Sequence, residues 1–94
     1  MTGENRFQII TSWDDGHKLD LNLAKLLKKY GLPAIFFIPS NCELNEEDIL
    51  RLINMGFEIG GHTVNHYQDL KLLGSYQLKY EIEANKLWLE RIIG

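Results

Sequence analysis

The sequence has one cysteine, two prolines and no long uninterrupted apolar run. Because Cys42 has no cysteine partner in the chain, an internal disulfide is excluded. Every apolar run is well short of the roughly 20 residues that a membrane-spanning helix needs, so no membrane partner is expected. The N-terminus is polar and shows no apolar stretch of a secretory signal, so the expected location is the cytoplasm or is left open.

Basic residues are also few, and they are scattered among acidic ones. The chain has 10 Lys and Arg against 13 Asp and Glu, which gives a formal net charge of −3. A nucleic-acid-binding surface requires a basic patch or stripe, so no nucleic-acid partner is expected. Hydrophobic residues make up 45% and charged residues 24% of the 94 residues. These shares are typical of globular proteins, and the length fits one domain or part of one.

Strand-like and helix-like patterns alternate three times along the chain. The expected order is strand 7–13, helix 19–30, strand 34–38, helix 45–55, strand 57–60 and a final helix that begins near residue 75. The second strand is an apolar run between two prolines, typical of a strand buried on both faces. Asn45 is expected to cap the second helix and Ser75 the last one. The expected inward face of the last helix is Leu78, Ile82, Asn85, Leu89 and Ile92.

The alternation predicts an α/β fold with parallel strands, because successive β-α-β units take right-handed crossovers. The carboxyl ends of such strands meet at one edge, where binding sites are usually built. Three strands leave an unpaired sheet edge and one open face. We therefore expect either that the rest of the domain completes the sheet, or that copies of the chain associate through the open edge.

Two histidines follow the third expected strand. His62 and His66 are four positions apart, which on a helical turn would put both imidazoles on one face, close enough to share an ion. Ordinary surface or capping histidines are the alternative. Gly60 and Gly61 favour the site, because glycines permit a conformation or close approach that a side chain would obstruct.

Two aspartates, Asp14 and Asp15, end the first expected strand and precede Gly16. This tripeptide is also an ordinary turn signal. Adjacent carboxylates at a strand end need a cation or strong donors if they are buried. One aspartate together with His62 and His66 makes a three-ligand set, a count typical of catalytic zinc, and the other aspartate is then free to act as a base.

The motifs themselves resemble those of a known family. Residues 11–16 are similar to the Thr-Phe-Asp-Asp-Gly motif of NodB-type polysaccharide deacetylases (carbohydrate esterase family 4), with Trp13 in place of phenylalanine. Residues 62–66 resemble the second motif, His-Ser/Thr-x-x-His. His17 stands where the family often has proline, and we expect it in a loop. The family's later motifs, including the Leu-x-His motif with the general acid, do not occur in the chain.

The resemblance implies that residues 1–94 are an incomplete, N-terminal part of a polysaccharide deacetylase domain. They would form the βαβαβα portion of an irregular (β/α)7 barrel. By the same resemblance, Asp14 is the catalytic base, and Asp15, His62 and His66 hold a divalent metal. Zn²⁺ is the first choice, with Co²⁺, Mn²⁺ or Ni²⁺ as alternatives.

The implied activity is metal-dependent removal of N-acetyl or O-acetyl groups from an acetylated carbohydrate, a hydrolysis of non-peptide carbon–nitrogen bonds in the N-acetyl case. Two other functions stay open. One is a non-catalytic half-domain that binds a metal or a partner chain. The other is a receiver-type phosphoacceptor domain, in which an acidic pair after the first strand holds magnesium, but this leaves His62 and His66 without a role.

Overall fold

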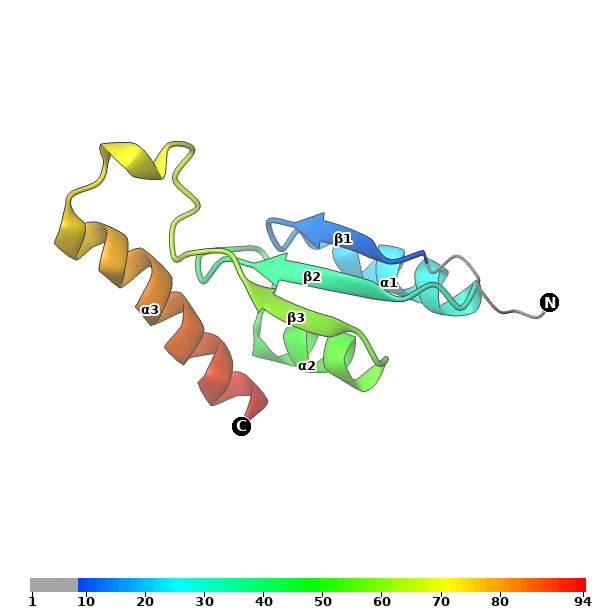
Figure 1. Ribbon diagram of the computed structural model, residues 1–94. Coiled ribbons are helices and arrows are strands. Elements are labelled where there is room, and N and C mark those ends of the chain that lie inside the picture. Colours follow the sequence, from blue (N-terminus) through cyan, green and yellow to red (C-terminus); the bar gives the residue numbers. More distant parts are fainter. Residues whose placement is uncertain (1–8) are drawn as a thin grey trace, which may run out of the picture.

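The computed structural model describes residues 9–94, in which three parallel strands alternate with three α-helices (Figure 1). The elements are β1 (Thr11–Asp14), α1 (Asp20–Lys29), β2 (Ala34–Ile38), α2 (Glu46–Asn54), β3 (Glu58–Gly61), a short 3-10 helix (Leu70–Leu72) and α3 (Ser75–Ile93). The predicted α/β class and element order are confirmed. Residues 7 and 8 of the expected first strand lie outside the described residues. No helix in the described part combines the length and apolar character needed to cross a membrane.

The two faces of the sheet have different surroundings. The strands pair in the order β1-β2-β3, and their register aligns Trp13 with Phe36 and Asp14 with Phe37. Because successive strand residues point to opposite faces, Phe36 and Phe37 mark the two sides. Phe36 is fully buried in the core cluster with residues of α1 and α2. Asp14 is exposed and Phe37 only half-buried, and no described helix covers their side (Figure 1).

The core lies between the sheet and the helices. Its buried members are Ala24, Leu27, Ala34, Phe36, Ile38, Leu44, Ile49, Leu52, Phe57 and Leu89. The rings of Phe36 and Phe57 meet edge to face, with centroids 5.5 Å apart. Full burial of a side chain of this size contributes about 1.5–3 kcal/mol. The apolar cluster therefore fixes α1 and α2 against β2.

The start of α2 matches the prediction from its capping residue. The Asn45 side chain accepts a hydrogen bond from the Asp48 backbone N–H at 2.9 Å, and the Asp48 carboxylate accepts one from the Asn45 N–H at 3.1 Å. This reciprocal capping box satisfies two backbone donors that the helix leaves without partners. Asn45 therefore determines where α2 begins.

One prediction for α3 is wrong, and a second is confirmed only in part. Its N-cap is Gly74, and Ser75 is the first helical residue instead of the cap. Asn85 and Leu89 of the expected inward face are buried, as predicted. Ile82 of that face is instead 53% exposed, and Glu81, which was not expected there, is buried. The predicted face therefore differs from the observed one at Ile82 and Glu81, because a buried glutamate was not expected. In Figure 1, α3 crosses the molecule beside the carboxyl ends of the strands.

Candidate metal centre

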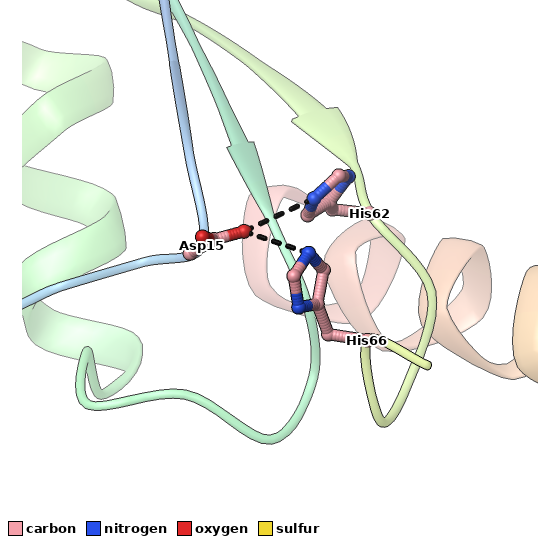
Figure 2. A group of neighbouring side chains, drawn as sticks. All are labelled: Asp15, His62 and His66. Carbon is pink, nitrogen blue, oxygen red and sulfur yellow. Dashed lines mark hydrogen bonds and ion pairs between the residues drawn. The ribbon is translucent and has the colours of Figure 1, made fainter. Parts of the chain in front are cut away.

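The predicted metal ligands come together from two loops that are far apart in the sequence. Asp15 follows β1, and His62 and His66 follow β3 (Figure 2). One oxygen of Asp15, Oδ1, lies 3.1 Å from His62 Nε2 and 2.9 Å from His66 Nε2. The two imidazole rings are 4.5 Å apart between centroids. The three side chains are 31–44% exposed, so solvent and solutes reach them.

The geometry and chemistry of this group fit a divalent metal ion. One ligand atom from each of Asp15, His62 and His66 lies within 4.8 Å of the other two. Two ligand atoms bound to a tetrahedral ion at about 2.1 Å lie about 3.4 Å apart, so small side-chain rotations would accommodate an ion. A carboxylate with two imidazoles suits zinc and neighbouring transition metals. Three protein ligands leave one position open for water.

A tight turn directs Asp15 toward the histidines. Asp15 has φ 80° and Gly16 has φ 62°, both in the left-handed region. The Asp15 N–H still donates to the carbonyl of Phe37 at 3.1 Å, which ties the turn to β2. A Cβ atom at Gly16 would lie 2.9 Å from Cβ and Sγ of Cys42. Glycine is therefore required at this position by both the conformation and the space.

The loop that carries the histidines is not helical, contrary to the expectation of a helical turn. Residues 62–66 lack helical assignment, and Thr63 and His66 have φ values of 64° and 55°. Among the described residues, the only non-glycine residues with positive φ are these two and Asp15. Such conformations cost of order 1–3 kcal/mol each and are often found at functional sites. Backbone strain is thus concentrated around the candidate ligands.

The glycines before His62 permit close packing, as predicted. A Cβ atom on Gly60 would lie 2.6 Å from Cδ1 of Phe37. A Cβ atom on Gly61 would lie 2.5 Å from Oδ1 of Asn85. Both distances are far below van der Waals contact, so any larger residue would displace its neighbour.

Hydrogen bonds from other segments hold the histidine loop. Ser40 N–H donates to the carbonyl of Thr63 at 3.0 Å, and Asn41 N–H to that of Val64 at 2.8 Å. His66 N–H donates to Oγ1 of Thr63 at 3.1 Å. The bonds from Ser40 and Asn41 anchor the loop to the segment that follows β2, and the bond from His66 closes a turn within the loop.

One buried residue of this region was not predicted from the sequence. Glu81 on α3 is 0% exposed and accepts hydrogen bonds from the same loop. Asn85 was expected on the inward face, but its bond to the His62 backbone was not foreseen. The spacing of Glu81 and Asn85 could have indicated that Glu81 is also inward, because residues four positions apart lie on the same face of a helix.

The other singled-out residues lie outside the ligand group. Asp14 is exposed at the end of β1. His17 is in a loop, as expected, with Nδ1 3.8 Å from Oε1 of Glu43. The Lys18 N–H donates to Glu43 at 2.8 Å, and this bond lowers the pKa of the Glu43 carboxyl. Burial raises the pKa of the Cys42 thiol, as expected for an unreactive cysteine.

Residues 3–94 match the family model described as polysaccharide deacetylase. No curated protein sequence matches the chain.

Several solved structures are similar. The peptidoglycan deacetylase PdaC from Bacillus subtilis is 27% identical, with a TM-score of 0.76 over 90% of this chain and 44% of that one. The Bc1960 peptidoglycan N-acetylglucosamine deacetylase has a TM-score of 0.82 at 23% identity, over 90% of this chain and 41% of that one. A family 4 carbohydrate esterase from Bacillus anthracis has a TM-score of 0.75 at 21% identity, over 88% and 42%. The chain thus spans less than half the length of these structures.

Proposed function

The chain belongs to the polysaccharide deacetylase family, and from this premise we propose that it carries the metal-binding part of a site that hydrolyses acetyl groups on a carbohydrate. The observation that carries the proposal is the convergence of Asp15, His62 and His66, whose ligand atoms lie within 4.8 Å of one another. The three residues occupy the corresponding positions of the two motifs on which the family resemblance rests.

In the proposed site, one carboxylate and two imidazoles hold a divalent ion, with Zn²⁺ preferred and Co²⁺, Mn²⁺ or Ni²⁺ as alternatives. A bound ion would polarise the acetyl carbonyl and lower the pKa of a nearby water. Asp15 supplies the negative charge, and the exposure of all three side chains leaves room for substrate. A groove lined by His62, Thr63, His66 and residues 67–71 gives a substrate access to both imidazoles.

Asp14 is the proposed general base. It is exposed, adjacent in sequence to Asp15, and lies at the carboxyl end of β1. A carboxylate there would accept the proton of the attacking water as the carbon–oxygen bond forms. The bond between the acetyl carbonyl carbon and the amide nitrogen would then break. The nitrogen stays on the sugar and takes up the proton that Asp14 accepted. The products are acetate and a free amino sugar.

The proposed substrate is an acetylated amino sugar in a polysaccharide. Two of the similar structures are described as peptidoglycan deacetylases, one of them as a peptidoglycan N-acetylglucosamine deacetylase. Removal of an O-acetyl group from a carbohydrate is the related alternative. No residue of the chain is assigned to binding the sugar.

Metal binding is the first test, and the third histidine provides a matched control. Titration of the 94-residue chain with Zn²⁺ in a calorimeter should give one site. Replacing His62 and His66 by alanine should weaken binding by at least about 100-fold, because two of three ligands are lost. The control His17→Ala removes an exposed loop histidine and should bind Zn²⁺ like the wild type. Equal binding by the double variant would refute the site.

Acetate release from N-acetylglucosamine oligomers is the second test. Activity of the zinc-loaded chain should fall by about 100-fold or more in Asp14→Asn, because a general base typically contributes at least that much to the rate, while zinc affinity is kept. Asp15→Asn should instead lose zinc affinity. Zinc binding without any acetate release would favour a non-catalytic, metal-binding half-domain.

A further inference from the structure

Two polar side chains of α3 are buried beneath the histidine loop. Glu81 is 0% exposed and Asn85 is 2% exposed. They are one helical turn apart and therefore lie on the same face of α3. Burying a carboxylate is unfavourable unless hydrogen bonds or a positive charge compensate it. Their contacts should therefore indicate why such residues are placed here.

Glu81 contacts the middle of the histidine loop. Its Oε1 accepts hydrogen bonds from the backbone N–H groups of Val64, at 3.1 Å, and Asn65, at 2.8 Å. Its Oε2 accepts a third from the Asn65 side-chain amide at 2.7 Å. Hydrogen bonds to an ionised acceptor are shorter and stronger than neutral ones. All three donors belong to the two residues immediately before His66.

Asn85 contacts the beginning of the same loop. Its Oδ1 accepts a hydrogen bond from the His62 backbone N–H at 2.8 Å. Its Nδ2 donates to the carbonyl of Ile38 at 3.1 Å and to Oγ of Ser40 at 3.0 Å. This amide therefore joins the start of the loop to the end of β2. With Asn85 at one end and Glu81 at the other, α3 fixes both histidine-bearing ends of the loop.

The conformation of the loop explains why it needs this support. Thr63 and His66 have left-handed φ angles, which L-residues rarely adopt. Val64 and Asn65 lie between them, and Glu81 accepts hydrogen bonds from the backbone N–H groups of both. A loop with two unfavourable residues would relax to other conformations unless fixed partners held it. Relaxation would change the spacing of the two imidazoles.

From these contacts we infer that Glu81 is a positioning residue for the metal site: its buried carboxylate holds residues 64 and 65 so that His62 and His66 both face Asp15. Glu81 is not among the candidate ligands, and its burial separates it from solvent and substrate. Metal affinity then depends on a side chain that does not touch the metal. The inference rests on the proposed function, since it concerns the affinity of that site.

The main experiment compares Zn²⁺ affinity in two charge-matched variants of the 94-residue chain. In Glu81→Gln, one of the two accepting oxygens becomes an NH2 group. This group would face N–H donors of Val64 or Asn65, so at least one hydrogen bond is lost. Zinc affinity should fall roughly 10-fold or more, as for other residues that orient metal ligands. Glu83→Gln removes the same charge from an exposed position of α3 and should leave affinity unchanged.

A general loss of stability is tested with a core variant. Leu52→Ala removes a buried side chain of α2 and should lower the melting temperature without changing zinc affinity of the folded protein. If Glu81→Gln binds zinc as tightly as wild type, or if Leu52→Ala weakens binding equally, the inference is overturned.

If Glu81→Gln does not fold, the milder substitution Asn65→Ala tests the same inference. Asn65→Ala removes the third bond to Glu81 and a contact with the side chain of Asn41. It should weaken zinc binding several-fold, whereas Asn41→Ala, which removes only that contact, should not. Equal affinities in these two variants would contradict the role of Glu81.

Hydrogen exchange of the metal-free protein separates this inference from the proposed function. The amides of Val64 and Asn65 should exchange at least about 10-fold faster in Glu81→Gln than in Glu83→Gln, because their acceptor is weakened. Failure of the wild type to bind zinc would refute the proposed metal site alone. Unchanged exchange at these two amides would overturn the positioning role whatever the zinc result.

Discussion

Adjacent aspartates have different surroundings in this structure. Asp15 has a left-handed backbone and lies within 3.1 Å of both imidazoles. Asp14 has a strand backbone and an exposed side chain on the sheet face that no described helix covers. This difference supports separate proposed roles, a ligand for Asp15 and a base for Asp14.

Asp20, the first residue of α1, should make stability depend on pH. It is 7% exposed, and its Oδ2 has no hydrogen-bond partner among the described residues. Burial raises the pKa of this carboxyl above 3.8, with His17 partly opposing the effect. A carboxyl whose pKa is raised by folding destabilises the folded state once it ionises. The loss therefore grows as the pH rises through 3.8 to the folded-state pKa, and then stays constant.

Asp20→Asn has no charge to bury and should avoid that loss. We expect its melting temperature to exceed that of wild type by a few degrees at pH 7, with the difference shrinking toward pH 3.5. Thermal unfolding at both pH values measures it. Glu90→Gln, which removes an exposed acid on α3, serves as control. A difference for Asp20→Asn that is independent of pH would show that the buried charge is not its cause.

At the residue scale, the sequence predicted that the side chains of the candidate ligands would come together, but not the backbone conformation that brings them together. Asp15, His62 and His66 were identified because their residue types are metal ligands and because parallel strands end at one edge. The helical turn expected for His62 and His66 was wrong, since their spacing is also compatible with a strained loop. The positive φ angles at Thr63 and His66 could not be predicted from the sequence. A β-branched threonine rarely adopts that conformation, and histidine, although enriched in it, adopts it in only a minority of cases.

At the scale of elements, periodicity located helices better than it oriented them. The bounds of α2 and β2 were predicted closely, because Asn45 and the two prolines give local stop and start signals. The inward face of α3 was predicted at Asn85 and Leu89, but Ile82 was wrongly included and Glu81 was left out. Glu81 is buried through hydrogen bonds with a loop, and no local pattern in the helix reveals such a partner.

The approach of α3 to β3 depends on the absence of a side chain at Gly61. In Gly61→Ala, the new Cβ would lie 2.5 Å from Oδ1 of Asn85, which its hydrogen bonds hold in place. We expect a loss of about 1–3 kcal/mol in the free energy of unfolding, as for other overpacked sites. Chemical denaturation measures the loss.

The matched control is Gly74→Ala. A Cβ there would contact nothing within 4 Å, and the φ of −69° suits alanine. We expect a loss of only a few tenths of a kcal/mol, arising from the weaker N-cap. A Gly61→Ala variant as stable as Gly74→Ala would show that α3 moves freely with respect to β3.

At the scale of the whole molecule, the sheet is open among the described residues. β1 and β3 are its edge strands, each paired on one side only. The sequence predicted this from the count of three strands. Association of copies through an edge stays a prediction, as does the incomplete status of the domain. Both predictions concern what pairs with the open edges of the sheet, and local sequence patterns in these residues do not specify that partner.

A metal bound by Asp15, His62 and His66 would join the two edge strands at their carboxyl ends. Zinc at 100 times its dissociation constant should stabilise the folded chain by about 2.7 kcal/mol. For a chain of this length, the melting temperature should rise by about 10 °C or more. Thermal unfolding with and without zinc measures the rise. The double variant with alanine at 62 and 66 should show none, and an equal rise there would assign the effect to other sites.

The separation of the candidate ligands along the chain has a consequence for the order of folding. Asp15 and His62 are 47 positions apart, and β2 lies between the strands that carry them. Closing so long a segment is entropically unfavourable until the intervening pairing exists. The ligand set therefore assembles only after the β1–β2 and β2–β3 pairings have formed. Metal capture would be a late event during refolding, and the ion would act on the unfolding rate more than on the rate of collapse.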